Sequence, residues 1–414
     1  MATITFRKII FWCHLPVGVI AGLVVLTMSV TGALLAYERQ IESWADTRGY
    51  RVGPAAAGVT RLSAETLLGK VREARPDLTP AAITLRAAPT APAAIGLGGD
   101  RVIYADPYTG QVLGEGCAKT RNFFRTVTDL HRWLGASGDQ RPVGRAITGA
   151  CNLGFLFLVL SGFYLWWPRK WNWSQVRNVL WFKRGLDGKA RDFNWHNVIG
   201  FWSAVPLFII VISGAVISYP WASNLVYRLV GETPPPRNAP GPAGNQRREN
   251  ARRGDDGSRS QPAAPPLKGL DDGWSRAEQQ VPGWQSISVR IPASEEAPLT
   301  FTIDEGNGGQ PQKRGQLTFE RKSGEVTRWE PFSSFTSGRK LRTVLRFAHT
   351  GEVIGLIGQT LAGLVSIGAA VLVWTGLFLS WRRLRAWRAR RSRMPVPATS
   401  PLPDGVSETG GSNA

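Results

Sequence analysis

The sequence predicts a mainly α-helical membrane protein: a four-helix transmembrane bundle made of two tandem repeats, with two small α+β domains outside the membrane. Three observations predict it: four long apolar runs without charge, an internal repeat, and four histidines confined to the ends of those runs. A helix rises about 1.5 Å per residue, so about 20 apolar residues cross the hydrocarbon core of a bilayer. The runs that pass this length are Leu15–Tyr37, Ala146–Trp167, Asn197–Tyr219 and Val353–Trp381.

The formal net charge of +20 is concentrated beside these runs. The flanking basic residues are Arg7, Lys8, Arg169, Lys170, Arg177, Lys183, Arg184, Arg382, Arg383, Arg385, Arg388, Arg390 and Arg391. Positive residues next to membrane spans stay on the cytoplasmic side. We therefore expect both termini and the loop 169–195 inside, the two long segments outside, and a membrane lipid rather than a nucleic acid as the partner of this charge.

The chain contains an internal repeat. When His14 is aligned with His196, Gly32 falls on Gly214 without a gap. The second and fourth runs also align, and their matched residues are Gly144 with Gly358, Gly149 with Gly363, Ser161–Gly162 with Thr375–Gly376, and His131 with His349. Each half is therefore predicted to run helix, external segment, helix.

The two external segments show the same order of elements. In the first, an amphipathic helix is predicted over 62–76, strands over 82–86, 92–96 and 101–105, and a turn over 106–110. In the second, a helix is predicted over 272–280, strands over 285–291, 299–303 and 315–320, and a turn over 322–326. Each segment is therefore expected to form a small α+β domain.

These patterns divide the chain into consecutive parts. The expected parts are a first transmembrane helix in 1–38; a first external domain in 39–122; a His-bearing helix and second transmembrane helix in 123–168; a cytoplasmic loop in 169–195; a third transmembrane helix in 196–221; a second external segment in 222–340, with a disordered linker in 232–268 and a domain in 269–335; a fourth transmembrane helix in 341–391; and a disordered cytoplasmic tail in 392–414.

The histidines carry the functional prediction. His14 and His196 occupy equivalent positions at the inner ends of the first and third runs, and His131 and His349 precede the second and fourth runs on the outer side. The chain has no other histidine. Ionisable groups in a membrane bundle are costly and are usually functional. Neutral imidazole binds iron, copper and zinc well. We therefore expect two metal sites, one at each membrane face.

Haem is the ligand that two histidines suit best. Two imidazoles from different helices can hold one haem iron axially while apolar helix faces cover the macrocycle. Zinc normally needs a third or fourth ligand, and the sequence places no further donor at both pairs. Copper, zinc or a purely structural role for the histidines remain the alternatives. Two haems stacked across the bilayer would carry electrons through it.

Glycines and arginines near the histidines are secondary candidates. Gly18 and Gly200 lie one turn from a histidine, where they would let a flat macrocycle approach or, equally, let helices pack closely. Arg145 and Arg346 flank the outer pair, where they would bind haem propionates or lipid headgroups. No nucleophile and base can be assigned, so no catalytic residue is expected beyond the haem ligands.

Several motifs resemble a known family. They are the D-P-Y-T-G-x-V turn at 106–112, the R-T-V…D-L-H-R-W-L-G stretch at 125–135 and the S-G-F-Y-L-W-W stretch at 161–167. With the His-bearing spans, they resemble the PepSY-associated transmembrane family, over about 1–231 and 267–391. The second external segment has Glu320-Arg321-Lys322-Ser323-Gly324 in place of the D-P-Y-T-G turn.

The resemblance implies a location and a function. Family members are bacterial inner-membrane proteins with PepSY-like periplasmic domains, and some are similar to di-haem reductases that pass electrons to ferric siderophores. It implies two haem b groups, one on His14 and His196 and one on His131 and His349. The inner segments are too short for a nucleotide-binding domain, so a quinol or a separate cytosolic reductase would supply electrons.

Two other functions remain open from the sequence. The external domains, which lack catalytic residues, would suit a regulatory or binding protein that restrains a periplasmic protease or sensor. A siderophore or peptide transporter is disfavoured, because four spans with polarity only at their ends offer no substrate path.

Overall fold

Four long helices form the membrane bundle of the computed structural model, which describes residues 5–50, 52–53, 59–98, 101–167, 172–236 and 265–391. They are α1 (Phe6–Leu35), α5 (Arg141–Trp166), α7 (Gly188–Ser218) and α12 (Gly355–Arg391). Each is long and apolar enough to cross a bilayer, which confirms the four predicted spans. Most of the predicted linker and the whole predicted tail lie outside the described residues.

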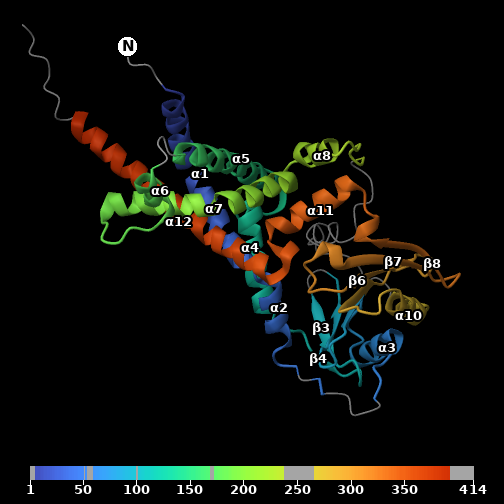
Figure 1. The fold of residues 1–414 in the computed structure, drawn as a ribbon. Coiled ribbons are helices and arrows are strands. Elements are labelled where there is room, and N and C mark those ends of the chain that lie inside the picture. Colours follow the sequence, from blue (N-terminus) through green and yellow to red (C-terminus); the bar gives the residue numbers. More distant parts are fainter. Residues whose placement is uncertain are drawn as a thin grey trace, which may run out of the picture.

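The four spans form a closed ring in which α1 contacts α5 and α12, and α7 contacts the same two helices. The helices α1 and α7 therefore lie diagonally across the bundle. Large apolar side chains such as Ile20 and Leu23 point outward and are exposed, as side chains that face lipid must be. The first residues of α1 and the last of α12 lie at the end of the bundle away from the sheet (Figure 1).

Short helices flank the spans. They are α2 (Glu38–Thr47), α4 (Ala118–Trp133), α6 (Trp173–Leu180), α8 (Pro220–Leu229) and α11 (Ser337–His349). The helix α4 packs on α1 and α5, whereas α11 packs on α7 and α8. Since α4 carries His131 and α11 carries His349, the repeat places both histidines against the diagonal helices α1 and α7.

The external segments form one antiparallel sheet. Its strands are β1 (Ala82–Arg86), β2 (Ala93–Gly96), β3 (Val102–Ala105), β4 (Val112–Gly114), β5 (Ser286–Arg290), β6 (Leu299–Asp304), β7 (Arg314–Glu320) and β8 (Glu325–Pro331), in the order β4-β3-β2-β1-β5-β6-β7-β8. The six predicted strands are present; β4 and β8, at the two edges of the sheet, were not predicted because β4 is short and β8 is largely exposed.

The sequence predicts two separate domains. The structure instead joins the two halves in one sheet and one core. Strand β1 pairs with β5, with Ile83 opposite Val289. The helices α3 (Ala64–Ala74) and α10 (Leu270–Gln280) lie on the same side of the sheet (Figure 1) and close one apolar core. The alternation of apolar and polar residues along a strand does not reveal which distant strand will pair with it. The pairing of β1 with β5 was therefore not predicted.

The first turns of α3 and α10 cap each other. The carboxylate of Glu65 accepts hydrogen bonds from the backbone N–H groups of Leu270 and Asp271, at 2.9 and 3.2 Å. In return, the carboxylate of Asp271 accepts one from the N–H of Glu65 at 2.9 Å. Each carboxylate satisfies N–H groups that a helix start leaves unpaired, and each lies at the positive end of a helix dipole. The pair links the two repeats.

Buried polar contacts fix the sheet to the bundle. Asp46 of α2 accepts hydrogen bonds from the Tyr104 hydroxyl (3.0 Å), the Cys117 backbone N–H (2.7 Å) and the Arg121 guanidinium (2.5 Å). Burial and the neighbouring Asp46 carboxylate raise the pKa of Tyr104, so its hydroxyl remains a donor. In addition, the guanidinium of Arg39 on α2 pairs with the carboxylate of Glu352, which lies just before α12 in the second half of the chain. These contacts set the start of α4, and through it the place of His131.

We expect Gly144→Ala to destabilise the protein, whereas Gly154→Ala will not. A Cβ at Gly144 would overlap the backbone carbonyl of Trp133, where α4 turns into α5. At Gly154 a Cβ would lie 3.5 Å from a Val17 methyl, an ordinary contact. Replacing a helical glycine by alanine otherwise adds about 1 kcal/mol of helix propensity. Thermal unfolding in detergent checks this: equal melting temperatures for the two variants would contradict the close backbone approach.

Candidate functional site

The four histidines meet as two pairs, one in each layer of the bundle. His131 of α4 and His349 of α11 form a sheet-side pair, whose ring centroids lie 6.2 Å apart with the ring planes inclined at 57°. His14 of α1 and His196 of α7 form a far-side pair, at equivalent positions of two helices that lie diagonally across the bundle.

A hydroxyl from another helix holds each imidazole through its Nδ1 atom. The hydrogen bonds join His14 to Ser161 at 2.8 Å, His131 to Thr31 at 2.9 Å, His196 to Thr375 at 3.0 Å and His349 to Ser213 at 3.3 Å. Every hydroxyl is on one of the four spans, and every span supplies one hydroxyl. The repeat thus gives each histidine the same support.

The direction of these bonds fixes the tautomer. The Thr31 hydroxyl donates its only proton to the backbone carbonyls of its own helix, the nearer being Thr27 at 2.6 Å. Ser161, Thr375 and Ser213 do the same on their helices. A hydroxyl engaged in this way accepts from the imidazole, so the pattern favours a proton on Nδ1. For His349 the backbone carbonyl of Ile210, 2.8 Å from Nδ1, requires the same.

The consequence is that Nε2 holds the lone pair in all four histidines. A histidine whose Nδ1–H is tied to an oxygen is the usual metal ligand, because the second bond orients the ring and raises its basicity. Two such rings that face each other across a gap can supply two axial ligands to one metal ion. The close approach of the His131 and His349 rings, at 6.2 Å, is of this kind.

A glycine follows every one of the four hydroxyl residues. An added Cβ would lie 3.5 Å from the Cε1 atom of His131 at Gly32, and 3.5 Å from that of His14 at Gly162. At Gly214 and Gly376 it would lie 3.3 Å from His349 and His196. The missing side chains make room for the imidazoles beside the span backbones. A serine or threonine followed by glycine is therefore one unit that seats a histidine.

The two layers are well separated. His14 and Thr31, on α1, are seventeen residues apart, as are His196 and Ser213 on α7. At the helical rise this is about 25 Å, most of the hydrocarbon thickness. Between the layers Leu207, Val365 and Ala369 form a buried apolar cluster. The buried hydroxyl of Ser203 donates to the Ile199 carbonyl of its own helix. One metal ion cannot reach both pairs.

Other metal ligands are not gathered near the pairs. In the described parts of the chain, no three histidine, cysteine, aspartate or glutamate side chains lie close enough to hold a metal together. None of the three cysteines forms a disulfide bond. Among the described residues, the donor set at each layer thus consists of two imidazoles. Such a set suits a metal ion that is already bound to other ligands in a cofactor.

The secondary candidates lie beside other groups of the bundle. An added Cβ at Gly18 would meet Leu158 of α5 at 3.8 Å, and one at Gly200 would meet Leu372 of α12 at 3.6 Å. Their role beside a macrocycle stays a prediction. Arg145 is exposed and donates to the Ser218 carbonyl at 3.4 Å, while Arg346 lies 5.8 Å from the centre of the Phe347 ring.

Sequence reasoning missed the hydroxyls that hold the histidines. It aligned Ser161–Gly162 with Thr375–Gly376 as part of the repeat but gave them no role. Thr31–Gly32 and Ser213–Gly214 show the same pattern in the other two spans. A usable signal was present: each span contains one serine or threonine followed by glycine. Each of these dipeptides lies at the same depth in the bundle as a histidine from another helix.

Comparison with known proteins identifies the family. A family model, described as the PepSY-associated TM region, matches residues 11–383. The chain belongs to this family. The match covers all four spans, all four histidines and both halves of the sheet, as the sequence motifs predict. A search of curated proteins finds no match to the chain. In this PepSY-associated protein the paired histidines are thus part of the region that defines the family.

Nitrogen chemical shifts test the tautomer assignment. In ¹⁵N-histidine-labelled protein without added cofactor, the neutral rings are expected to show a protonated Nδ1 and an unprotonated Nε2. Thr31→Val removes the acceptor for His131 and should shift the signals of that ring, while the other three stay unchanged. Thr27→Val, which removes a hydroxyl bonded only to its own helix at Leu23, is the matched control. A majority of rings protonated at Nε2 would contradict the assignment.

Proposed function

We propose that the protein is a di-haem b electron-transfer protein of the bacterial inner membrane that reduces ferric siderophores on the periplasmic side. It would thus be an oxidoreductase that releases ferrous iron. The observation that carries the proposal is the close approach of the His131 and His349 rings, together with a hydroxyl on the Nδ1 atom of each of the four histidines. The sheet and its helices would then lie in the periplasm, and both termini in the cytoplasm, as the flanking basic residues favour.

The residues of the sheet-side layer fit a haem, and the far-side layer has the same donor set. Imidazole–metal bonds are about 2 Å long, so an iron ion held between two rings sets their centres roughly 6 Å apart. The sheet-side rings lie 6.2 Å apart at their centroids. The two-imidazole donor set leaves four equatorial positions of an iron ion for a porphyrin. Zinc or copper bound by protein alone would need further ligands, and the described residues bring none together.

Each group of residues would have its own role. The imidazoles would hold the two irons, and the hydroxyls of Thr31, Ser161, Ser213 and Thr375 would keep the Nδ1 protons in place so that the ligands stay neutral. The apolar bundle would cover the macrocycles and exclude water. The cofactor, when bound, would supply reversible one-electron chemistry at iron. A ferric ion reduced to ferrous binds hard oxygen ligands less tightly and leaves its chelator.

The haem-to-protein ratio of histidine variants tests the proposal. Haem-replete protein should show a Soret band and two haems per chain. Each single change, His14→Ala, His131→Ala, His196→Ala or His349→Ala, should remove one haem, because one axial ligand no longer suffices. His131→Ala combined with His349→Ala should lose no more than either alone, whereas His14→Ala combined with His131→Ala should lose both.

Two results would end the proposal. Protein from haem-replete cells without a Soret band would exclude the cofactor. If substitution of all four histidines left the cellular function intact, the alternative would hold: a regulatory protein whose external sheet binds and restrains a periplasmic protease or sensor.

A further inference from the structure

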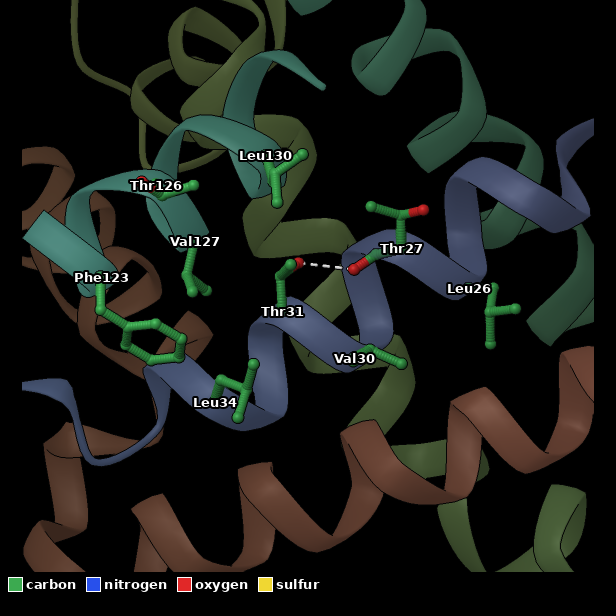
Figure 2. A pocket seen from close by; sticks show the side chains of 9 residues that line it. All are labelled: Leu26, Thr27, Val30, Thr31, Leu34, Phe123, Thr126, Val127 and Leu130. Atoms are coloured by element: carbon green, nitrogen blue, oxygen red, sulfur yellow. Dashed lines mark hydrogen bonds between the residues drawn. The ribbon is translucent and has the colours of Figure 1, made fainter. Parts of the chain in front are cut away.

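A groove of about 470 Å³ lies between α1 and α4, beside the sheet-side histidine pair (Figure 2). It is lined by Leu26, Thr27, Val30, Thr31, Leu34, Phe123, Thr126, Val127 and Leu130. The lining is mainly apolar, and the α1 wall belongs to a membrane span. Val30 is 46% exposed and Phe123 51%, so the groove opens to the exterior of the bundle at membrane depth. Its occupant must therefore be soluble in hydrocarbon.

The internal repeat shows that the open groove belongs to one half only. In the second half the equivalent position, between α7 and α11, is filled by Ala222 and Val226 of α8. Leu34 lines the groove and is 44% exposed, whereas its repeat equivalent, Val216, is 7% exposed beneath α8. The first half has α2 after its span instead, and the pocket residues include none from α2. The gap is filled by protein in one repeat and left free in the other.

One wall of the groove is in direct contact with the sheet-side pair. Thr31 lines the groove, and its hydroxyl holds the Nδ1 atom of His131 at 2.9 Å. The proton of this hydroxyl is used on the Thr27 carbonyl, as Figure 2 shows. The hydroxyls of Thr27 and Thr126 likewise donate to carbonyls of their own helices. The polar groups of the lining therefore act toward a ligand as hydrogen-bond acceptors.

We propose that this groove binds an isoprenoid quinol, the electron donor of the protein; the inference rests on the proposed haem function. A quinol is soluble in hydrocarbon and carries two hydroxyl donors, which match an apolar groove with acceptor oxygens. A saturated acyl chain has no group for those acceptors.

The electron count agrees with two haem sites. Oxidation of one quinol to quinone breaks two O–H bonds, releases two protons to the water on the sheet side, and yields two electrons. A haem held by each imidazole pair would supply one one-electron site, so the two together would take both electrons. Delivered singly, they reduce two ferric ions to two ferrous ions.

The retained quinone tests binding without reliance on turnover. Protein purified from membranes in mild detergent is extracted with organic solvent, and quinone and phospholipid are quantified. Wild type should retain about one quinone per chain. Val30→Trp and Thr126→Phe, which fill the groove from opposite walls, should lose it. Leu23→Trp, a lipid-facing position on α1 outside the groove and 73% exposed, should retain it. Wild type without quinone, or with phospholipid lost from the filled variants instead, would overturn the proposal.

Reduction kinetics separate this proposal from the haem proposal. A short-chain quinol should reduce the haem spectrum of wild type and Leu23→Trp at the same rate, and that of Val30→Trp at least tenfold more slowly. Dithionite should reduce all three completely. Haems that dithionite reduces but the quinol does not would overturn the groove assignment and leave the haem function standing. The absence of a Soret band would overturn both.

Discussion

The hydrogen bond from each imidazole Nδ1–H to a hydroxyl on a neighbouring span is the interaction on which the bundle's chemistry depends. A polar ring inside a membrane is costly unless its donor and acceptor are satisfied. The hydroxyl satisfies the donor, and it is itself bonded to a carbonyl of its own helix. In the proposed function this support would orient the imidazoles before a metal binds.

The internal repeat explains why this interaction occurs four times. Each repeat contributes a histidine at the far end of one span and another on the short helix that precedes the next span. The partners of the far-side pair come from α1 and α7, which face each other diagonally, while α5 and α12 supply the supporting hydroxyls. In the sheet-side layer the roles are exchanged: α4 and α11 bring the histidines, and α1 and α7 the hydroxyls. Asp46 of α2 joins α4 to the sheet, because its carboxylate accepts hydrogen bonds from Arg121 of α4 and from Tyr104 of β3.

Much of this could be predicted from sequence because hydrophobic length and exact repeats are local signals. The four spans, the equivalence of His14 with His196 and of His131 with His349, and six of eight strands follow from them. The pairing of β1 with β5 could not be predicted, since strand partners separated by a span pair leave no local trace. The hydroxyls were missed for a different reason: Thr31 and Ser213 are ordinary residues in an apolar run until a histidine from another segment is placed beside them. For Gly18 and Gly200 the sequence left close helix packing and room for a macrocycle equally open; added Cβ atoms there would meet leucines of α5 and α12.

Density in the bundle is the most direct test of the central claim that each imidazole pair clasps one iron. A cryo-electron microscopy map of haem-replete protein in a lipid nanodisc, at a resolution that shows side chains, should contain a flat feature between His131 and His349 and another between His14 and His196. Each should join two Nε2 atoms, with the Nδ1 atoms on their hydroxyls. Imidazoles turned so that Nε2 meets protein or water, with no planar density between them, would contradict the account.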